Sequence, residues 1–305
     1  MPWIYHQLNH NLPKYKKKFL FIGLGTMGYP MAGHLSKTKD IDLFVFNRTI
    51  KTTKNWLKQY KGNYYNPNEL LNIKFDGLIT CLKDDAAILE ILINQNLVST
   101  LKKNSFVIDH STTSLDLIQK ISSNQAVIAK KISFFDSPVS GGEAGAINGS
   151  LSVMFGGPKN KVLTIKKIMN AYSKSIVHIG PSGHGQLTKM VNQICIAGLI
   201  QALSEGISLG KSVNLNMEKV FIAISNGAAQ SWQMDNRFET MINEKFDFGF
   251  AVDLMIKDLN IALKESKDNN LTLNISNQVL KQYKKLSKQG DGDLDTSSLI
   301  KLIKS

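Results

Sequence analysis

One lysine in this chain is placed to do acid–base chemistry. Lys189 lies one turn into a long helical pattern, with Asn192 three and Gln193 four residues further on, so all three project from one helical face. The apolar residues that follow predict that this helix is buried. Burial can lower a lysine pKa from about 10.4 toward neutrality, where the amine can donate and accept a proton. We therefore predict that Lys189 is a general acid/base.

A glycine-rich turn follows the first predicted strand. There the first glycine of the pattern G-x-G-x-x-G permits a tight turn, the second lets the backbone approach a pyrophosphate, and the third lets the helix pack against the strand. At the junction of a strand and a helix, this pattern predicts a dinucleotide-binding loop. The loop residues are Gly23, Leu24, Gly25, Thr26, Met27 and Gly28.

The end of the second predicted strand bears on the choice of dinucleotide. Sites that prefer NAD usually place an Asp or Glu about twenty residues after the glycines, where it binds the adenosine ribose hydroxyls. Here the acid is absent, and Arg48 stands between Asn47 and Thr49. Because a guanidinium suits a ribose 2′-phosphate, we predict that these three residues favour NADP(H) over NAD(H).

A second glycine-containing turn follows a later strand. Ser140, Gly141 and Gly142 place a hydroxyl group and exposed amides in a tight turn, where they can form an anion pocket. A turn that merely needs small residues would explain the glycines but not the serine. We therefore predict that this segment binds a substrate anion.

The order of the predicted elements indicates two parts of the chain. Short apolar strands alternate with helical patterns up to residue 179, which predicts an α/β fold with a Rossmann-type, doubly wound sheet. After the GPSG sequence at 180–183 only helical patterns follow, beginning with one long helix at 184–211. We predict an extension at 1–18, an NADP-binding Rossmann domain at 19–182, and an all-helical domain for substrate binding and oligomerisation at 183–305. The long helix joins the two domains.

The predicted strands span 19–24, 42–46, 76–82, 105–109, 132–136, 151–155 and 176–179. The stretch 136–157 departs from the alternation and predicts an antiparallel element. The predicted helices before the long one span 27–36, 51–60, 85–93 and 115–122, and those after it span 218–224, 251–267 and 273–286.

The charge of +13 first suggests a protein that binds polyanions. However, 35 of the 37 cationic residues are lysines, whereas bidentate phosphate or guanine recognition relies on arginine. We therefore expect no nucleic-acid partner.

No spacing of histidines or cysteines predicts a metal site. Arg237, the second of the two arginines, has no predicted role.

The remaining composition indicates a cytoplasmic protein. Cys81 and Cys195 lie in apolar surroundings far apart in the sequence and are expected to be reduced core thiols. The longest apolar run, 190–203, is shorter than a membrane span and contains amides, and residues 1–18 match neither a signal nor a transit peptide. We expect no membrane partner. The long helix and the apolar helical domain predict a homodimer or homotetramer.

Five motifs in order resemble the β-hydroxyacid dehydrogenase family, which includes 3-hydroxyisobutyrate dehydrogenases, tartronate semialdehyde reductases and glyoxylate/succinic semialdehyde reductases. They are GLGTMG at 23–28, DHSTTS at 109–114, DSPVSGG at 136–142, GHGQLTKMVN at 183–192 and KDL at 257–259. The resemblance runs from residue 19 to the last residue. It implies that Ser140, Gly141 and Gly142 hold a substrate carboxylate and that Lys189 is catalytic.

The resemblance also implies further contacts. Leu82, Lys83 and Thr112 match cofactor contacts near the nicotinamide, and Lys257 matches a lysine that reaches the cofactor from the helical domain. Asn192 matches a substrate contact. At position 193 many relatives have an Asn that contacts substrate. This chain has Gln193 there, which is expected to bind substrate as well, with the amide kept but lengthened by a methylene. That departure predicts a reshaped substrate pocket.

These observations predict an NADP(H)-dependent oxidoreductase. It would interconvert a small β-hydroxyacid and its semialdehyde or oxoacid by hydride transfer, with Lys189 as general acid/base. An imine reductase of the same architecture is an alternative, although those enzymes generally lack Lys at this position. Decarboxylating 6-phosphogluconate dehydrogenases are longer and would need more arginines. A non-catalytic dehydrogenase-like binding module is the alternative from another class.

Overall fold

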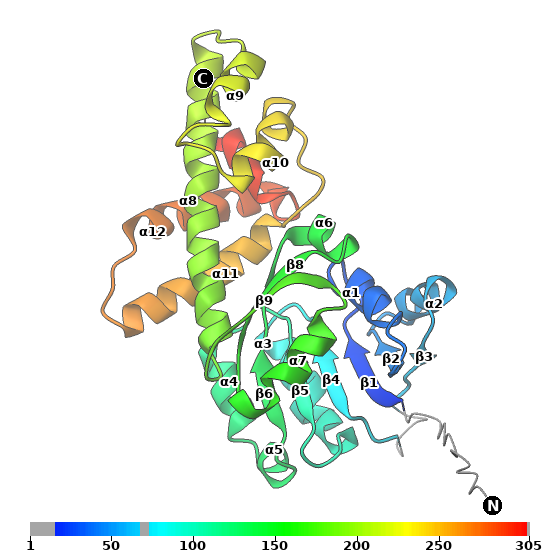
Figure 1. Cartoon of the computed structure of the whole chain (residues 1–305). Helices are drawn as coiled ribbons and strands as arrows, with labels where there is room; N and C mark the ends of the chain where they lie inside the picture. The colour runs from blue at the N-terminus through cyan, green and yellow to red at the C-terminus, as the bar shows by residue number, and fades with distance from the viewer. Residues whose placement is uncertain (1–15, 68–72, 304–305) are drawn as a thin grey trace, which may run out of the picture.

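The computed structural model describes residues 16–67 and 73–303, and its first part is built on one sheet (Figure 1). The strand order is β3-β2-β1-β4-β5-β6-β8-β7, with β9 beside β8. Every pairing from β3 to β6 is parallel, whereas β8 runs antiparallel to both β6 and β7. The strands are β1 (Lys17–Ile22), β2 (Ile41–Phe46), β3 (Asn63–Tyr64), β4 (Gly77–Thr80), β5 (Phe106–Asp109), β6 (Ser133–Asp136), β7 (Val139–Ser140), β8 (Leu151–Gly156) and β9 (Ser173–Gly180).

Helices cover both faces of this sheet because its strands are apolar on both sides. Along β1, Phe19 and Phe21 belong to one hydrophobic core, and Leu20 and Ile22 belong to another. The first core includes side chains of α1, α2 and α7, and the second includes side chains of α3 and α4. The helices are α1 (Gly28–Leu35), α2 (Ile50–Gln59), α3 (Asp85–Leu89), α4 (Leu115–Ser122), α5 (Gln125–Ala129), α6 (Gly142–Ile147) and α7 (Val162–Met169). The predicted doubly wound fold is confirmed.

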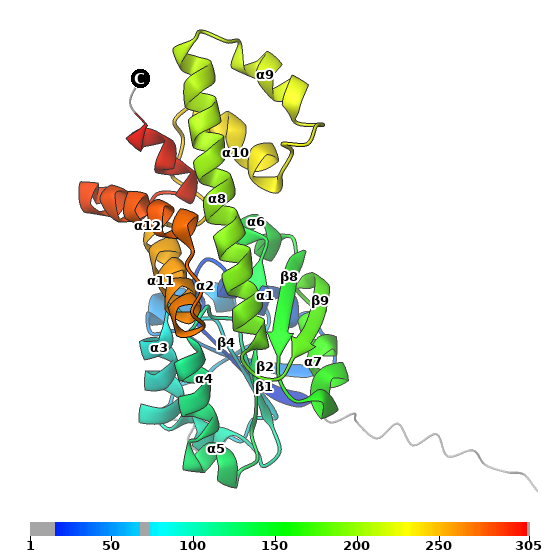
Figure 2. The same cartoon turned by 90° about the vertical axis from the view of Figure 1, so that its left-hand side faces the viewer.

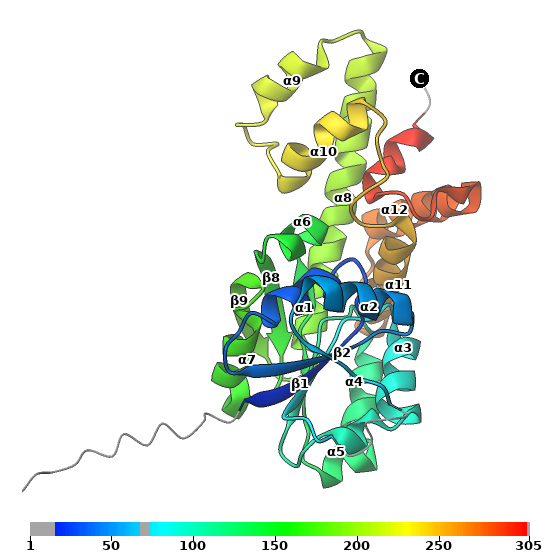
Figure 3. The same ribbon diagram turned by 90° about the vertical axis from the view of Figure 1, so that its right-hand side faces the viewer.

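The second part of the chain is helical in all its regular elements up to residue 303. Its helices are α8 (His184–Ser212), α9 (Met217–Ile224), α10 (Trp232–Ile242), α11 (Val252–Asp268) and α12 (Asn274–Leu286), followed by the 3-10 helix η5 (Thr296–Leu302). The 29-residue α8 starts at the edge of the sheet and extends to the far end of the helical part (Figures 2 and 3). By length and composition α8 could cross a membrane, but here it packs against β8, α10, α11 and α12.

The start of α8 is bound to the sheet by buried hydrogen bonds. The Asp136 carboxylate, at the end of β6, accepts from the amides of Gly183 at 2.8 Å and Gln186 at 2.9 Å. The Gln186 side chain then donates to the Ser111 carbonyl at 2.7 Å and accepts from the Thr113 amide at 3.1 Å. These contacts hold the first turn of α8 over the carboxyl ends of β5 and β6.

Some sequence predictions need correction. The first strand begins at Lys17, so the predicted extension ends two residues earlier, and most of its length lies outside the described residues. The helix predicted over 85–93 ends as α at Leu89 and continues as a wider π-turn over Glu90–Asn94. Cys195 is exposed on α8, so its assignment to the core was wrong, whereas Cys81 is partly buried. The division of the chain at residue 183 stays a prediction.

Arg237 has a structural role. Its guanidinium donates to both carboxylate oxygens of Asp295, at 2.9 and 3.3 Å, and lies over the rings of Trp232 and Phe248. Asp295 is fully buried and also accepts hydrogen bonds from the Phe250 amide and from Ser297. This charge pair therefore connects α10 to the segments before α11 and at the start of η5.

Replacing Arg237 by Met should lower the free energy of unfolding by about 3 kcal/mol, because the Asp295 carboxylate would stay buried without its cation. Urea denaturation measures this change. The matched control is Lys301→Met, which breaks the 2.7 Å pair between Lys301 and Asp291 at the surface. There we expect a loss below about 1 kcal/mol. Equal losses in the two variants would contradict the structural role of Arg237.

Candidate active site

Of the three glycines in the G-x-G-x-x-G pattern, Gly25 is the one with open space above its backbone. A Cβ atom at Gly23 would lie 2.2 Å from the Cys81 carbonyl oxygen, and one at Gly28 would lie 1.9 Å from the Gly23 carbonyl oxygen. Both positions therefore require glycine for the packing of the loop itself. A Cβ atom at Gly25 would meet nothing within 4 Å. The space above Gly25 is open, which is where the backbone must approach a pyrophosphate.

The same loop presents unused hydrogen-bond donors. Within the described chain, the amides of Gly25, Thr26 and Met27 donate to no protein acceptor, and they precede α1. A cavity of about 390 Å³ opens here; its lining residues are Leu24, Gly25, Thr26, Tyr29, Pro30, Tyr60, Glu143 and Ile147. Free amides at a helix N-terminus beside an open cavity fit the phosphates of a dinucleotide.

The residues after β2 lie beside this loop. The Asn47 side chain accepts from the Leu24 amide at 3.0 Å and thereby joins the end of β2 to the glycine loop. Arg48 and Thr49 are exposed, and in the described part of the chain the Arg48 guanidinium forms no ion pair. It is therefore available to an external anion.

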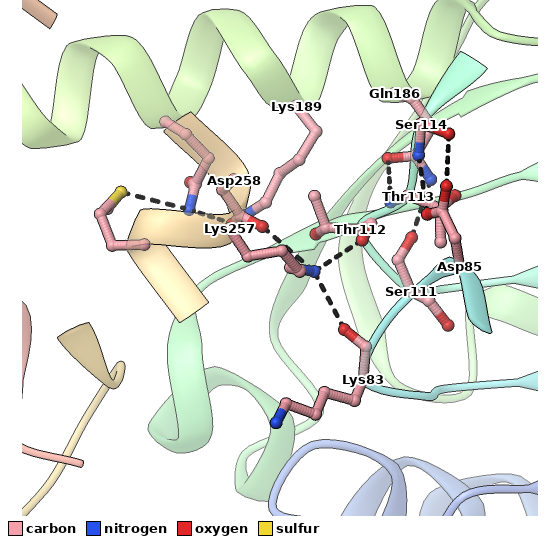
Figure 4. A network of polar contacts seen from close by, with 12 residues as sticks. Lys83, Asp85, Ser111, Thr112, Thr113, Ser114, Gln186, Lys189, Lys257 and Asp258 are labelled. Carbon is pink, nitrogen blue, oxygen red and sulfur yellow. Dashed lines mark hydrogen bonds and ion pairs between the residues drawn. The ribbon is translucent and has the colours of Figure 1, made fainter. Parts of the chain in front are cut away.

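Lys189 projects from α8 into the junction between the two parts of the chain (Figure 4). The residue is only 7% exposed, and its Nζ donates to the Val139 carbonyl oxygen at 2.9 Å. Burial lowers the pKa of Lys189 to about 8; the carboxylate of Asp258 acts in the opposite direction, and the Lys257 ammonium adds to the lowering. Near neutral pH, this lysine can therefore act as a proton donor.

The predicted anion pocket adjoins Lys189. Val139 and Ser140 form β7, so the carbonyl group that holds Lys189 directly precedes Ser140. Gly141 and Gly142 have φ values of +125° and +60°, which favour glycine, and α6 begins at Gly142. The Ser140 hydroxyl lies 3.4 Å from Asn192 Oδ1 on α8. The structure thus brings together Lys189, Asn192 and the turn at 140–142.

Gln193 lies at the same junction but is buried, with 1% exposure. Its Nε2 donates to Asp258 Oδ2 at 2.8 Å, and its Oε1 accepts from Asn192 Nδ2 at 2.7 Å. Asp258 is a site residue that sequence reasoning missed, although it is next to Lys257 in the KDL motif. No spacing in the sequence shows that α11 would place this carboxylate against α8.

Two of the three predicted nicotinamide-side residues, Lys83 and Thr112, contact Lys257 (Figure 4). Lys257 Nζ donates to the carbonyl oxygens of Thr112 at 2.6 Å and Lys83 at 3.0 Å, and lies 3.2 Å from Asp258 Oδ1. The Leu82 amide donates to the Ser111 hydroxyl at 2.8 Å, which joins the loop after β4 to the loop after β5. One lysine of α11 therefore connects the helical part to the loops after β4 and β5.

Two buried titratable residues, Asp109 and His110, lie at the end of β5 beside these loops. Burial raises the pKa of Asp109 to about 6, although its carboxylate accepts from Thr80 and from the Ser111 amide. Burial lowers the pKa of His110 to about 4, so this imidazole is neutral near pH 7. Neither residue was predicted, because only tertiary contacts bury them. Within 16–67 and 73–303, no group of three or more His, Cys, Asp or Glu residues could hold a metal ion.

Fold and site together define an NAD(P)-binding oxidoreductase, with a Rossmann-type sheet, a glycine-rich loop and a buried lysine at the junction with a helical part. Two family models match the chain. One is the NAD binding domain of 6-phosphogluconate dehydrogenase, at residues 18–180, and the other is the NAD-binding region of NADP-dependent 3-hydroxyisobutyrate dehydrogenase, at residues 183–303. The chain belongs to the β-hydroxyacid dehydrogenase family of oxidoreductases.

Individual proteins agree with this membership. An uncharacterized oxidoreductase of Shewanella frigidimarina is 43% identical over 93% of this chain and 97% of its own length. The 2-hydroxy-3-oxopropionate reductase of Escherichia coli is 30% identical over 94% of this chain and 97% of its own. The fold matches that of the Mycobacterium tuberculosis 3-hydroxyisobutyrate dehydrogenase, with a TM-score of 0.82, 22% identity, and coverage of 95% of this chain and 100% of that one.

Proposed function

We propose that this protein interconverts a small β-hydroxyacid and its semialdehyde or oxoacid, with NADP(H) as the preferred hydride carrier. The observation that carries this proposal is the buried Lys189 ammonium, held by the Val139 carbonyl next to Ser140 and Asn192. The proposed proton donor thus lies beside the proposed anion-binding turn, and α6, which follows that turn, helps to line the cavity at the glycine loop. Family membership supports the reaction class.

In this proposal each group has a distinct task. The bound dinucleotide supplies or accepts the hydride at the substrate carbon. The amides of the turn at 140–142 and the Ser140 hydroxyl bind the substrate carboxylate. In the reductive direction the Lys189 ammonium polarises the carbonyl oxygen and donates its proton to it; in the oxidative direction the neutral amine takes the hydroxyl proton. Lys257 closes the helical part over the cofactor-side loops.

The preference for NADP(H) rests on Arg48. It is an exposed cation at the end of β2, where an NAD-specific site would have a carboxylate. Asn47 holds this segment against the glycine loop, so a 2′-phosphate bound there would lie within reach of the guanidinium.

The alternatives fit the site less well. An imine reductase would not require a lysine at position 189, and a non-catalytic binding module would not require a lysine buried at the expense of its hydration. The proposed dehydrogenase chemistry uses this lysine directly.

The rate of reduction should depend on pH through Lys189. The acid form donates the proton, so kcat/KM for a semialdehyde should be constant below pH 8 and fall about tenfold per pH unit above it. Oxidation of the hydroxyacid should show the opposite limb and rise through the same pH. Initial rates followed by NADPH absorbance, with short semialdehydes and hydroxyacids, measure both profiles.

Lys189→Met should lower kcat by about 10³-fold, because removal of a general acid costs two to four orders of magnitude. NADPH affinity should stay within about twofold, since the dinucleotide loop is untouched. Lys174→Met, which changes an exposed lysine on β9, is the control and should retain full activity. An active Lys189→Met enzyme would remove this residue from the mechanism.

Arg48→Ala should remove most of the preference for NADPH. Loss of a charge-assisted contact to the 2′-phosphate should raise KM for NADPH by about tenfold and leave KM for NADH nearly unchanged. Lys51→Ala, at an exposed position one residue into α2, is the matched control. Equal use of both dinucleotides by the unmodified enzyme would overturn the assignment.

We further propose that the protein is a cytoplasmic homo-oligomer. From residue 191 to the C-cap residue 213, one face of α8 is exposed and mainly apolar, with the exposed Glu205 at its margin, and Leu215 and Ile222 are exposed beyond its end. The exposed residues on that face are Val191, Cys195, Leu199, Ala202, Gly206, Leu209 and Val213. Because the residues of this face are uncharged and mostly apolar, a second copy of the same face is its simplest complement.

Leu209→Glu should therefore shift the chain to monomer, because the partner's apolar face offers no cation to the new carboxylate. Light scattering after size-exclusion chromatography measures the mass. Leu163→Glu, which changes an exposed leucine on α7, is the control and should leave the mass unchanged. A monomeric unmodified protein would overturn the proposed assembly, and fractionation of cells would test the location.

A further inference from the structure

The Gln193 side chain has no polar atom left for a substrate. Its two strong contacts go to Asp258 and Asn192, and its Nε2 also lies 4.0 Å from the sulfur of Met255. With 1% of the residue exposed, a ligand cannot reach the amide without displacing one of these partners. Gln193 therefore differs from the expectation that it binds substrate directly.

The contacts of Gln193 form a chain with only one consistent orientation. A carboxylate can only accept, so Asp258 requires the NH₂ group of Gln193 to face it. The Gln193 carbonyl then faces Asn192 and, being an acceptor, requires the NH₂ group of Asn192. Asn192 must in turn direct Oδ1 toward the Ser140 hydroxyl, 3.4 Å away. The Asp258 carboxylate on α11 thus determines which atom of the Asn192 side-chain amide on α8 faces the anion-binding turn.

We propose that Gln193 is a positioning residue for substrate binding, which transmits the orientation imposed by Asp258 to Asn192. This inference rests on the proposed function. In this orientation Asn192 keeps one Nδ2 hydrogen that Gln193 does not use, and this donor can bind a substrate carboxylate together with the turn at 140–142. The long 3.4 Å contact leaves the Ser140 hydroxyl able to turn toward the same anion.

The length of Gln193 is essential to this arrangement. Its amide spans from Asp258 to Asn192 with contacts of 2.8 and 2.7 Å, both near the optimum for hydrogen bonds. An asparagine, shorter by one methylene of about 1.5 Å, could not keep both contacts. Glutamine at this position and the carboxylate at 258 therefore act as a pair.

Gln193→Met, which is nearly isosteric and removes the amide, should raise KM for a carboxylate-bearing semialdehyde about tenfold, because Asn192 loses its fixed orientation. The value of kcat should change less than twofold, since Lys189 and the hydride carrier are untouched. A short aldehyde without a carboxylate should show no change in KM. For the carboxylate-bearing substrate, the KM of Gln193→Asn should lie between those of the unmodified enzyme and of Gln193→Met, because the shorter amide can keep one of the two contacts.

The matched control is Gln201→Met. Gln201 also lies on α8, and its amide donates to a carboxylate, Glu205, at 2.8 Å, but on the surface. Its kinetics should equal those of the unmodified enzyme. Melting temperatures of all variants show whether a loss of activity reflects unfolding.

Asp258→Asn separates the orientation from the charge. This change should raise KM as Gln193→Met does, and the double variant should be no worse than either single one, because both act through the same chain. The Asp258 carboxylate raises the pKa of Lys189, whereas burial and the Lys257 ammonium lower it. Removing the carboxylate should therefore lower this pKa further and shift the pH profile of reduction to lower pH. Gln193→Met should leave that profile unchanged.

A measurement without substrate tests the chain directly. The Asn192 side-chain amide proton that is bonded to Gln193, followed by NMR in the unliganded protein, should exchange slowly with solvent and become faster in Gln193→Met. Unchanged exchange, or an equal rise in KM for aldehydes with and without a carboxylate, would overturn the inference. Lack of activity in the unmodified enzyme would instead contradict the proposed function and leave the exchange result valid.

Discussion

The arrangement of this protein depends on a buried carboxylate at the end of β6. Asp136 binds the amides of Gly183 and Gln186, which are free donors at the start of α8, and thereby fixes where that helix begins. Burial raises the pKa of Asp136, and the amide hydrogen bonds oppose that rise. Gly185 is part of the same constraint, since a Cβ atom there would lie 2.3 Å from the Asp136 carbonyl oxygen. Lys189 lies one turn further along α8, so these contacts determine its position.

At the same junction, the Lys189 ammonium is buried without a carboxylate bound directly to it. Lys189 binds a carbonyl oxygen, and the carboxylate of Asp258 is bound by Gln193 and lies 3.2 Å from the ammonium of Lys257. Burial therefore dominates the pKa of Lys189, while Asp258 limits the fall. A direct ion pair would hold the proton more firmly and make it a poorer donor. The separation of Asp258 from Lys189 thus suits acid–base chemistry.

Local patterns in the sequence predicted the parts of the site that local geometry determines. The glycine loop requires Gly23 and Gly28 for its own packing, and the alternation of apolar residues in β1 determines which side chain enters which core. The pairing of Gln193 with Asp258 could not be predicted, because it joins residues 65 positions apart through the packing of α8 on α11. The role of Arg237 depends likewise on Asp295, 58 positions away.

The contacts of Lys257 have a consequence for which positions can vary. This lysine holds the loops after β4 and β5 through the main-chain carbonyls of Lys83 and Thr112, and every residue type supplies such a carbonyl. Substitutions at 83 and 112 can therefore change the side chains that these loops present without removing the acceptors that attach them to α11. Position 257 has no such freedom. The side chains of these two loops can therefore vary independently of the contacts that attach the loops to α11.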